Sequence, residues 1–206
     1  EQLKTALLGY PLLPYIELEQ LRARLRRVQP DTIQQFINTH IDSPIGEQLR
    51  NQYLNQRMQR NRWQDFLALY RKESATKEQR CYHADAVWQS GQQQQANELA
   101  RLLWLNQTSM PEQCDPVFHR LRKAGGINQQ LAWQRFELAV IAGENQLARY
   151  LVRYPKPKTA RKAQQLHELY RNPGRLNKHS QHDFRDPKQQ KILSASLTKL
   201  AKIKPE

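Results

Sequence analysis

Three side chains near the C-terminal end are of the types that bind transition metals. His179, His182 and Asp183 lie within five residues of one another, and imidazole and carboxylate groups are common zinc ligands. The rest of the sequence offers no clear further ligand at a matching spacing, so a solvated polar loop explains these residues better. Gly125-Gly126 indicates a helix end rather than a phosphate-binding loop. We therefore predict neither a metal site nor a cofactor.

A dense cluster of basic side chains precedes that segment. The sequence has 33 Lys and Arg against 19 Asp and Glu, a net charge of +14, and residues 155–206 alone carry 13 basic against 4 acidic residues. Such a balance favours an acidic partner, which could be nucleic acid, anionic lipid or an anionic polymer. A solvated basic face is the alternative to a binding patch. The cluster consists of Arg153, Lys156, Lys158, Arg161 and Lys162.

The two cysteines, Cys81 and Cys114, are too few for a disulfide-rich scaffold. They are either two buried thiols or one bridge, and their places at the two ends of a predicted helical hairpin favour the bridge. By the chain-entropy model, closing a loop of this length would stabilise the fold by roughly 3–4 kcal/mol. A bridge would indicate an oxidising compartment.

The hairpin between the cysteines is the clearest structural element of the sequence. Thr76 and Gln79 form a capping box, and the apolar residues of the following helix recur at three- and four-residue spacing until Ser90-Gly91. A second helix follows, in which we expect Trp104 and Leu105 at the end. The expected apolar positions are Cys81, Ala84, Val87 and Trp88 in the first helix and Ala96, Leu99, Leu102 and Leu103 in the second.

Similar amphipathic patterns cover the rest of the 206 residues, and no strand is predicted. The chain has only seven glycines, and helix breaks at Asn61, Gly91, Gly125 and Gly143 lie about one helix or one hairpin apart. This pattern predicts an all-α fold, a right-handed α-superhelix of short antiparallel hairpins, over a compact orthogonal bundle. We expect a single domain over residues 1–206. No run of about 18 apolar residues is present, so no membrane span is predicted.

Several stretches resemble the N-terminal horseshoe domain of soluble lytic murein transglycosylases. The resemblance is clearest over residues 1–154, beginning at Tyr10, while residues 155–206 are a more divergent basic continuation. The matching stretches are YPLLPYIE from Tyr10, RWQDFL from Arg62, CYHADAVW from Cys81, Ser90-Gly91, Ala96, Leu103-Trp104-Leu105, and CDPVF from Cys114.

The resemblance implies a periplasmic, exported protein. In that family a lysozyme-like catalytic domain follows the horseshoe and cleaves peptidoglycan glycan strands to 1,6-anhydromuropeptides, while the horseshoe positions the strand. The later catalytic motifs of that domain, Gly-Leu-Met-Gln and Ala-Tyr-Asn-Ala-Gly, do not occur in this sequence. Glu73-Ser74 matches the first catalytic dipeptide, but it lies in a polar connection, whereas a catalytic acid needs an apolar pocket. We therefore predict no catalytic residue.

The sequence thus predicts a non-catalytic module whose basic patch makes weak electrostatic contacts with peptidoglycan. Two other functions are weighed beside it: a cytoplasmic nucleic-acid binder, which no recognised motif supports, and a helical-repeat scaffold that binds a partner protein. If the chain ends inside a longer helical array, Leu193, Leu197 and Leu200 should be partly exposed.

Overall fold

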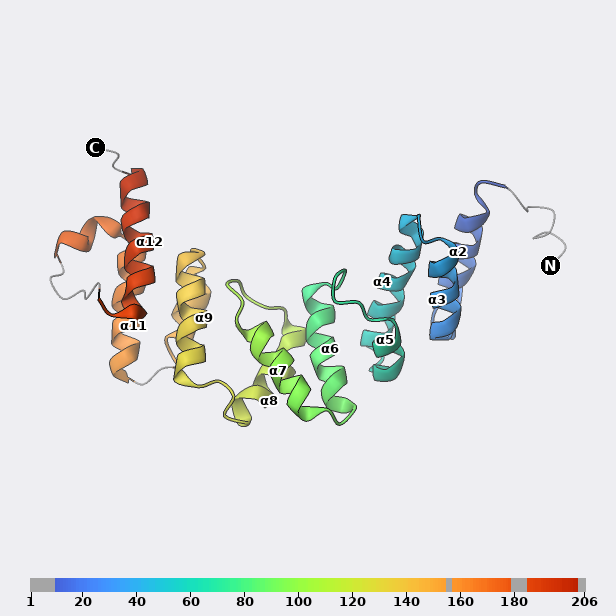
Figure 1. Cartoon of the computed structure of the whole chain (residues 1–206), viewed down its shortest axis with the longest axis horizontal. Coiled ribbons are helices and arrows are strands. Elements are labelled where there is room, and N and C mark those ends of the chain that lie inside the picture. Colours follow the sequence, from blue (N-terminus) through green and yellow to red (C-terminus); the bar gives the residue numbers. More distant parts are fainter. Residues whose placement is uncertain (1–9, 155–156, 179–184, 204–206) are drawn as a thin grey trace. The chain divides into compact units, whose positions relative to one another are not determined.

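The computed structural model describes residues 10–154, 157–178 and 185–203. Every regular element in these ranges is a helix, so the predicted all-α class is confirmed (Figure 1). The elements are α2 (Leu13–Ala23), α3 (Pro30–Thr39), α4 (Pro44–Gln59), α5 (Trp63–Leu69), α6 (Lys77–Gln89), α7 (Gln93–Trp104), η1 (Glu112–Cys114), α8 (Asp115–Lys123), α9 (Gln129–Ile141), α10 (Asn145–Leu151), α11 (Pro157–Arg171), η2 (Pro173–Lys178) and α12 (Pro187–Ile203).

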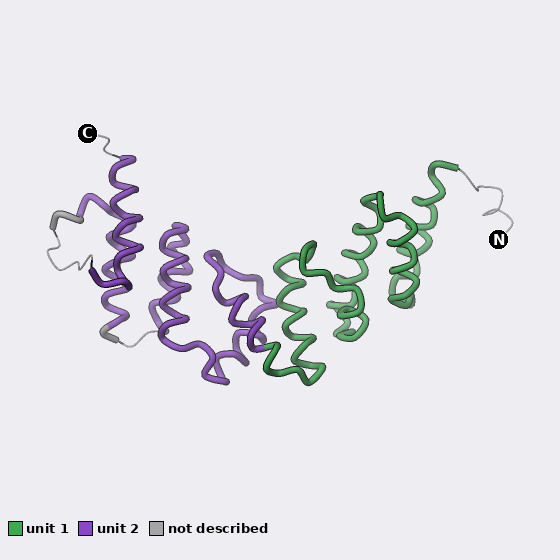
Figure 2. Tube along the Cα trace, viewed as in Figure 1, with its two compact units in different colours: residues 1–96 green, residues 97–206 purple. Residues whose placement is uncertain are grey.

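The chain divides into two compact units, residues 1–96 and residues 97–206 (Figure 2). The division falls inside α7, at Ala96. Each unit has its own set of packed helices, described separately below. The expectation of one domain over residues 1–206 stays a prediction.

All four predicted helix breaks have the left-handed backbone that ends a helix. The φ angle is 53° at Asn61, 86° at Gly91, 68° at Gly125 and 77° at Gly143. Asparagine and glycine are the residues that adopt this conformation most readily. The breaks were predictable because local sterics, rather than packing, decide where these helices stop.

The first unit is built around α4, which contacts α2, α3, α5 and α6. Leu49 and Tyr53 of α4 are completely buried, and α6 begins with the predicted capping box, in which Thr76 and Gln79 each bond the other's backbone N–H. Buried Gln79 also donates to Asn55 of α4, with Nε2 3.1 Å from Oδ1. The core of this unit consists of Leu18, Leu21, Val28, Ile33, Phe36, Ile37, Ile45, Leu49, Tyr53, Leu54, Phe66, Leu69, Tyr82 and Ala86.

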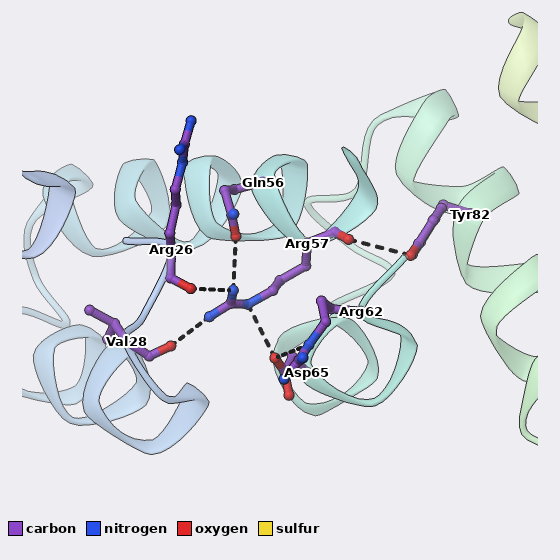
Figure 3. Close-up of polar contacts among 7 residues, drawn as sticks. All are labelled: Arg26, Val28, Gln56, Arg57, Arg62, Asp65 and Tyr82. Atoms are coloured by element: carbon purple, nitrogen blue, oxygen red, sulfur yellow. Dashed lines mark hydrogen bonds and ion pairs between the residues drawn. The ribbon is translucent and has the colours of Figure 1, made fainter. Parts of the chain in front are cut away.

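Arg57 of α4 joins several elements of the first unit through one buried guanidinium (Figure 3). Its Nη1 donates to the Arg26 carbonyl at 3.2 Å and its Nη2 to the Val28 carbonyl at 2.5 Å. Its Nε forms an ion pair with Asp65 of α5 at 3.3 Å, and the hydroxyl of Tyr82 in α6 donates to the Arg57 carbonyl. Arg57 therefore supplies donors to two backbone carbonyls of the segment that follows α2 and also pairs with a carboxylate.

The second unit is built around α9, which contacts α10, α11 and α12. Two polar interactions also join these helices. The Tyr170 hydroxyl of α11 donates to the Ile141 carbonyl of α9 at 2.8 Å, and Lys191 Nζ of α12 lies 2.9 Å from Glu137 Oε1 of α9. The apolar core of the unit includes Leu121, Ala132, Phe136, Ala139, Val140, Ala148, Leu151, Leu166, Leu169, Ile192 and Leu193.

Two expectations about apolar faces are wrong. Leu102 is 68% exposed, because the fully buried residues of α7 are Ala96, Ala100 and Trp104, which recur every four residues, while Leu99 and Leu103 are half-buried. Leu193 is completely buried, although Leu197 is 44% exposed as expected and Leu200 is half-buried. Leu193 is covered because α12 packs on both α9 and α11.

Candidate functional site

The second unit contains a cavity of about 490 Å³, a volume within the range of small-ligand sites. Its walls come from the end of α7, the connection before η1, and helices α8, α9 and α10. The lining residues are Trp104, Ser109, Met110, Asp115, Phe118, His119, Arg122, Arg135, Gln146, Leu147, Tyr150 and Tyr154.

A buried arginine of α9 forms one wall of this cavity. Arg135 is 4% exposed, and its guanidinium carbon lies 4.2 Å from the ring centre of Trp104 and 5.4 Å from that of Phe118. The ring of Trp104 meets that of Phe118 edge to face, with centroids 5.2 Å apart. Burial lowers the pKa of Arg135 to about 10, so the side chain still carries its charge at neutral pH.

Two tyrosines form the wall contributed by α10 and the residues after it. Tyr150 and Tyr154 share a hydrogen bond between their hydroxyl oxygens at 2.8 Å, and the ring of Tyr154 packs edge-on against Trp104. Burial raises the pKa of Tyr154, the bond to Tyr150 raises it further, and the charge of Arg122 opposes the rise. The Tyr154 phenol is therefore a neutral hydrogen-bonding group at neutral pH.

The exposed rim of the cavity carries Asp115, His119 and Arg122 of α8. Counted with Arg135, the lining holds two permanent cations and one carboxylate. The net charge of the lining is therefore positive. Because the lining offers one carboxylate rather than a pair, it lacks the acid and base pair of a glycoside hydrolase. Aromatic walls with a few convergent polar groups are typical of a small-ligand site.

The predicted basic patch is only partly described by the structure. Arg153 and Arg161 are exposed, and the Arg153 guanidinium lies 5.8 Å from the ring centre of Tyr150, a residue of the cavity. Lys162 is paired with Asp186, so its ammonium group is less available to bind an external anion. Lys156 lies outside the described residues, as does the side chain of Lys158. The patch stays a prediction.

Both cysteines of the chain are completely buried and disulfide-bonded.

Glu73 is exposed in a turn before α6, the position expected of a solvated side chain and not of a catalytic acid. His179, His182 and Asp183 lie outside the described residues. In the described ranges, His, Cys, Asp and Glu form no group of three or more able to hold a metal ion. The same ranges contain no helix with the length and apolar character needed to cross a bilayer.

The sequence placed Trp104 at the end of an amphipathic helix, and this residue is buried. It missed the cavity, because the residues that line it are far apart in the sequence. One signal was available. Arg135 lies two residues after Trp133 and directly before Phe136, and a charged residue that is buried beside such large apolar side chains needs a partner.

No protein-family model matches the chain. Comparison with curated proteins finds relatives that share one name. The soluble lytic murein transglycosylase of Escherichia coli K12 is 30% identical over 151 residues, which is 73% of this chain and 23% of that protein. The protein of the same name from Salmonella typhimurium LT2 gives the same identity and coverage. The chain thus spans about a quarter of the length of these relatives.

Solved structures show the same relationship over nearly the whole chain. The lytic transglycosylase Slt of Pseudomonas aeruginosa, solved as an inactive mutant, superposes with a TM-score of 0.82 at 25% identity, covering 98% of this chain and 33% of that one. The 70-kDa soluble lytic transglycosylase of Escherichia coli gives a TM-score of 0.77 with the same identity and coverage. This chain is therefore a homologue of the helical domain of soluble lytic murein transglycosylases and shares its superhelical fold.

Proposed function

We propose that this chain is a non-catalytic peptidoglycan-binding domain that positions glycan strands for cleavage by a catalytic domain elsewhere in the parent enzyme. The observation that carries the proposal is the 30% identity to soluble lytic murein transglycosylases over 151 residues. The relatives are named as lytic transglycosylases of murein, and the motifs that we associate with catalysis do not occur in this sequence.

The exposed charges support the choice of an anionic polymer. Arg153 and Arg161 are exposed on the second unit, and the chain as a whole carries +14. Peptide stems of peptidoglycan carry carboxylates, so contacts with exposed arginines would be weak and sensitive to salt. The disulfide supports an oxidising compartment, and with the family relationship it leads us to place the protein in the periplasm.

Co-sedimentation with purified sacculi tests binding, and product analysis of the same mixture tests catalysis. We expect the chain to sediment with sacculi at low salt, to be released as salt rises, and to produce no 1,6-anhydromuropeptides. Cleavage by this chain alone would refute the non-catalytic role. Failure to sediment at low salt would refute binding.

Two double variants of equal charge separate a specific basic surface from general charge. Arg153→Gln with Arg161→Gln should weaken co-sedimentation, while Arg24→Gln with Arg27→Gln, which removes exposed arginines from the first unit, should have a smaller effect. Equal losses in the two variants would mean that net charge alone drives the association.

A further inference from the structure

Arg135 differs from the other buried arginines of the described residues in having no carboxylate partner. Arg50 is paired with Glu47, and Arg57 with Asp65. Arg135 is as buried as Arg57, at 4% exposure, yet its contacts are with the faces of aromatic rings. A buried cation without an anion is costly, and cation–π contacts return only part of that cost.

Two buried donors beside the cavity also have no acceptor in the structure. These are Arg135 Nε and the indole Nε1 of Trp104, and both residues line the cavity. A buried donor without an acceptor is destabilising, so the site lacks hydrogen-bond acceptors. It has spare N–H groups and positive charge, and it needs oxygen atoms and negative charge.

We propose that this cavity binds a carboxylate of a peptidoglycan peptide stem, with the Arg135 guanidinium pairing with the carboxylate oxygens. The choice of a peptide stem rests on the function proposed above, whereas the choice of a carboxylate rests on the cavity alone. Arginine presents a planar fork of donors that matches a carboxylate. Arg122 at the rim adds a second positive charge.

The remaining lining groups fit the rest of such a ligand. The hydroxyls of Tyr150 and Tyr154 can donate to or accept from peptide groups, and Trp104 and Phe118 offer apolar faces to small side chains. Asp115 at the rim disfavours a second carboxylate there and suits an amino group. The cavity is therefore selective for one carboxylate in an otherwise polar or zwitterionic peptide, and not for highly charged polyanions.

The indole N–H resonance of Trp104 in a nitrogen-15 NMR spectrum reports on the cavity directly. The chain has four tryptophans, and Trp104→Phe assigns the resonance by removing it. The ligand is a disaccharide with a peptide stem. It is compared with the same compound after amidation of its carboxyl groups and with a neutral N-acetylglucosamine disaccharide. We expect the Trp104 resonance to shift with the first compound, and amidation to weaken binding about tenfold or more.

Arg135→Met is the variant that tests the guanidinium, because methionine keeps an unbranched apolar stem against Trp104. It should weaken binding of the peptide-bearing compound to the level of the amidated one. Arg101→Met removes the same charge from an exposed site outside the cavity and should leave binding unchanged. Circular dichroism checks that both variants fold. The amidated compound tests the same claim on the unaltered protein if Arg135→Met does not fold.

Failure of this inference is distinct from failure of the proposed function. If sacculi sediment with the chain but the Trp104 resonance does not respond, or responds equally to the amidated compound, the cavity assignment is overturned while peptidoglycan binding stands. If the peptide-bearing compound binds in the cavity but sacculi do not sediment, the cavity assignment holds and strand positioning fails. Equal binding by Arg135→Met and the unaltered protein overturns the assignment.

Discussion

At the scale of single residues, buried arginines have two different roles. Arg57 satisfies the carbonyls of Arg26 and Val28 and pairs with Asp65, so all the partners it needs are within the first unit. Arg135 in the second unit is surrounded by aromatic rings and spare donors. The guanidinium of Arg57 thus has two carbonyl acceptors and a carboxylate beside it, whereas no carboxylate is paired with Arg135 in the described residues.

Arg57→Ala should destabilise the chain by about 3–5 kcal/mol, because it leaves backbone carbonyls and the Asp65 carboxylate without their buried partner. Arg62→Ala is the matched control. Its Nε lies at the same 3.3 Å from Asp65 Oδ2, but its side chain is 61% exposed, so its loss should cost less than about 1 kcal/mol. Urea unfolding followed by circular dichroism measures both. Similar losses for the two variants would contradict the role given to Arg57.

His167 gives the second unit a dependence on pH. It is 6% exposed and 3.0 Å from Asn145 Oδ1. Burial lowers its pKa, as do Arg171 and Arg149, against the weaker opposite effect of Glu168. The folded chain therefore binds a proton less readily than the unfolded chain, whose histidine titrates near about 6.5. The free energy of unfolding should fall as pH drops below that value.

His167→Gln keeps a hydrogen-bonding side chain beside Asn145 and removes this titration. The difference in unfolding free energy between pH 7.5 and pH 5.5 should therefore be smaller in the variant than in the unaltered chain. Some dependence should remain, because burial also lowers the pKa of His83 in the first unit. An unchanged pH dependence in His167→Gln would show that this histidine is not the titrating group.

At the scale of elements, left-handed residues decide where helices end. Gly91 closes α6 with a φ of 86°, and no atom would meet a methyl group added there. Gly91→Ala should therefore destabilise the chain by about 1 kcal/mol through backbone strain alone. Gly174 also has open space around it but no positive φ, so Gly174→Ala should be neutral or slightly stabilising. Thermal unfolding of the two variants compares them, and an equal response would contradict the strain argument.

At the scale of the whole molecule, the disulfide is the covalent constraint. Both cysteines are bonded, so mass spectrometry without reductant should find no thiol available for alkylation. Replacing both with serine should lower the unfolding free energy by roughly 3–4 kcal/mol. Free thiols in protein purified from its native compartment would contradict an oxidising environment and, with it, the periplasmic assignment.

The elements of this molecule could be predicted from the sequence because their causes are local. The capping box at Thr76 and the ends at Asn61, Gly91, Gly125 and Gly143 depend on residues only a few positions apart. The all-α class followed from the same periodicity. The resemblance to lytic transglycosylases was also visible, because short contiguous stretches between Tyr10 and Phe118 carry it.

Which face of a helix is buried, and which distant side chains meet, was decided only by the tertiary structure. Periodicity expected Leu102 inside, but the packing of α7 buried Ala100 and Trp104 instead. Composition pointed to the exposed arginines after α10, whereas the cavity gathers Arg135, Trp104 and Tyr154 from segments that the sequence keeps apart. Local pattern fixes where helices form, because each hydrogen bond in a helix spans four residues. A binding cavity needs contacts over tens of residues, and only the packing of helices against one another creates them.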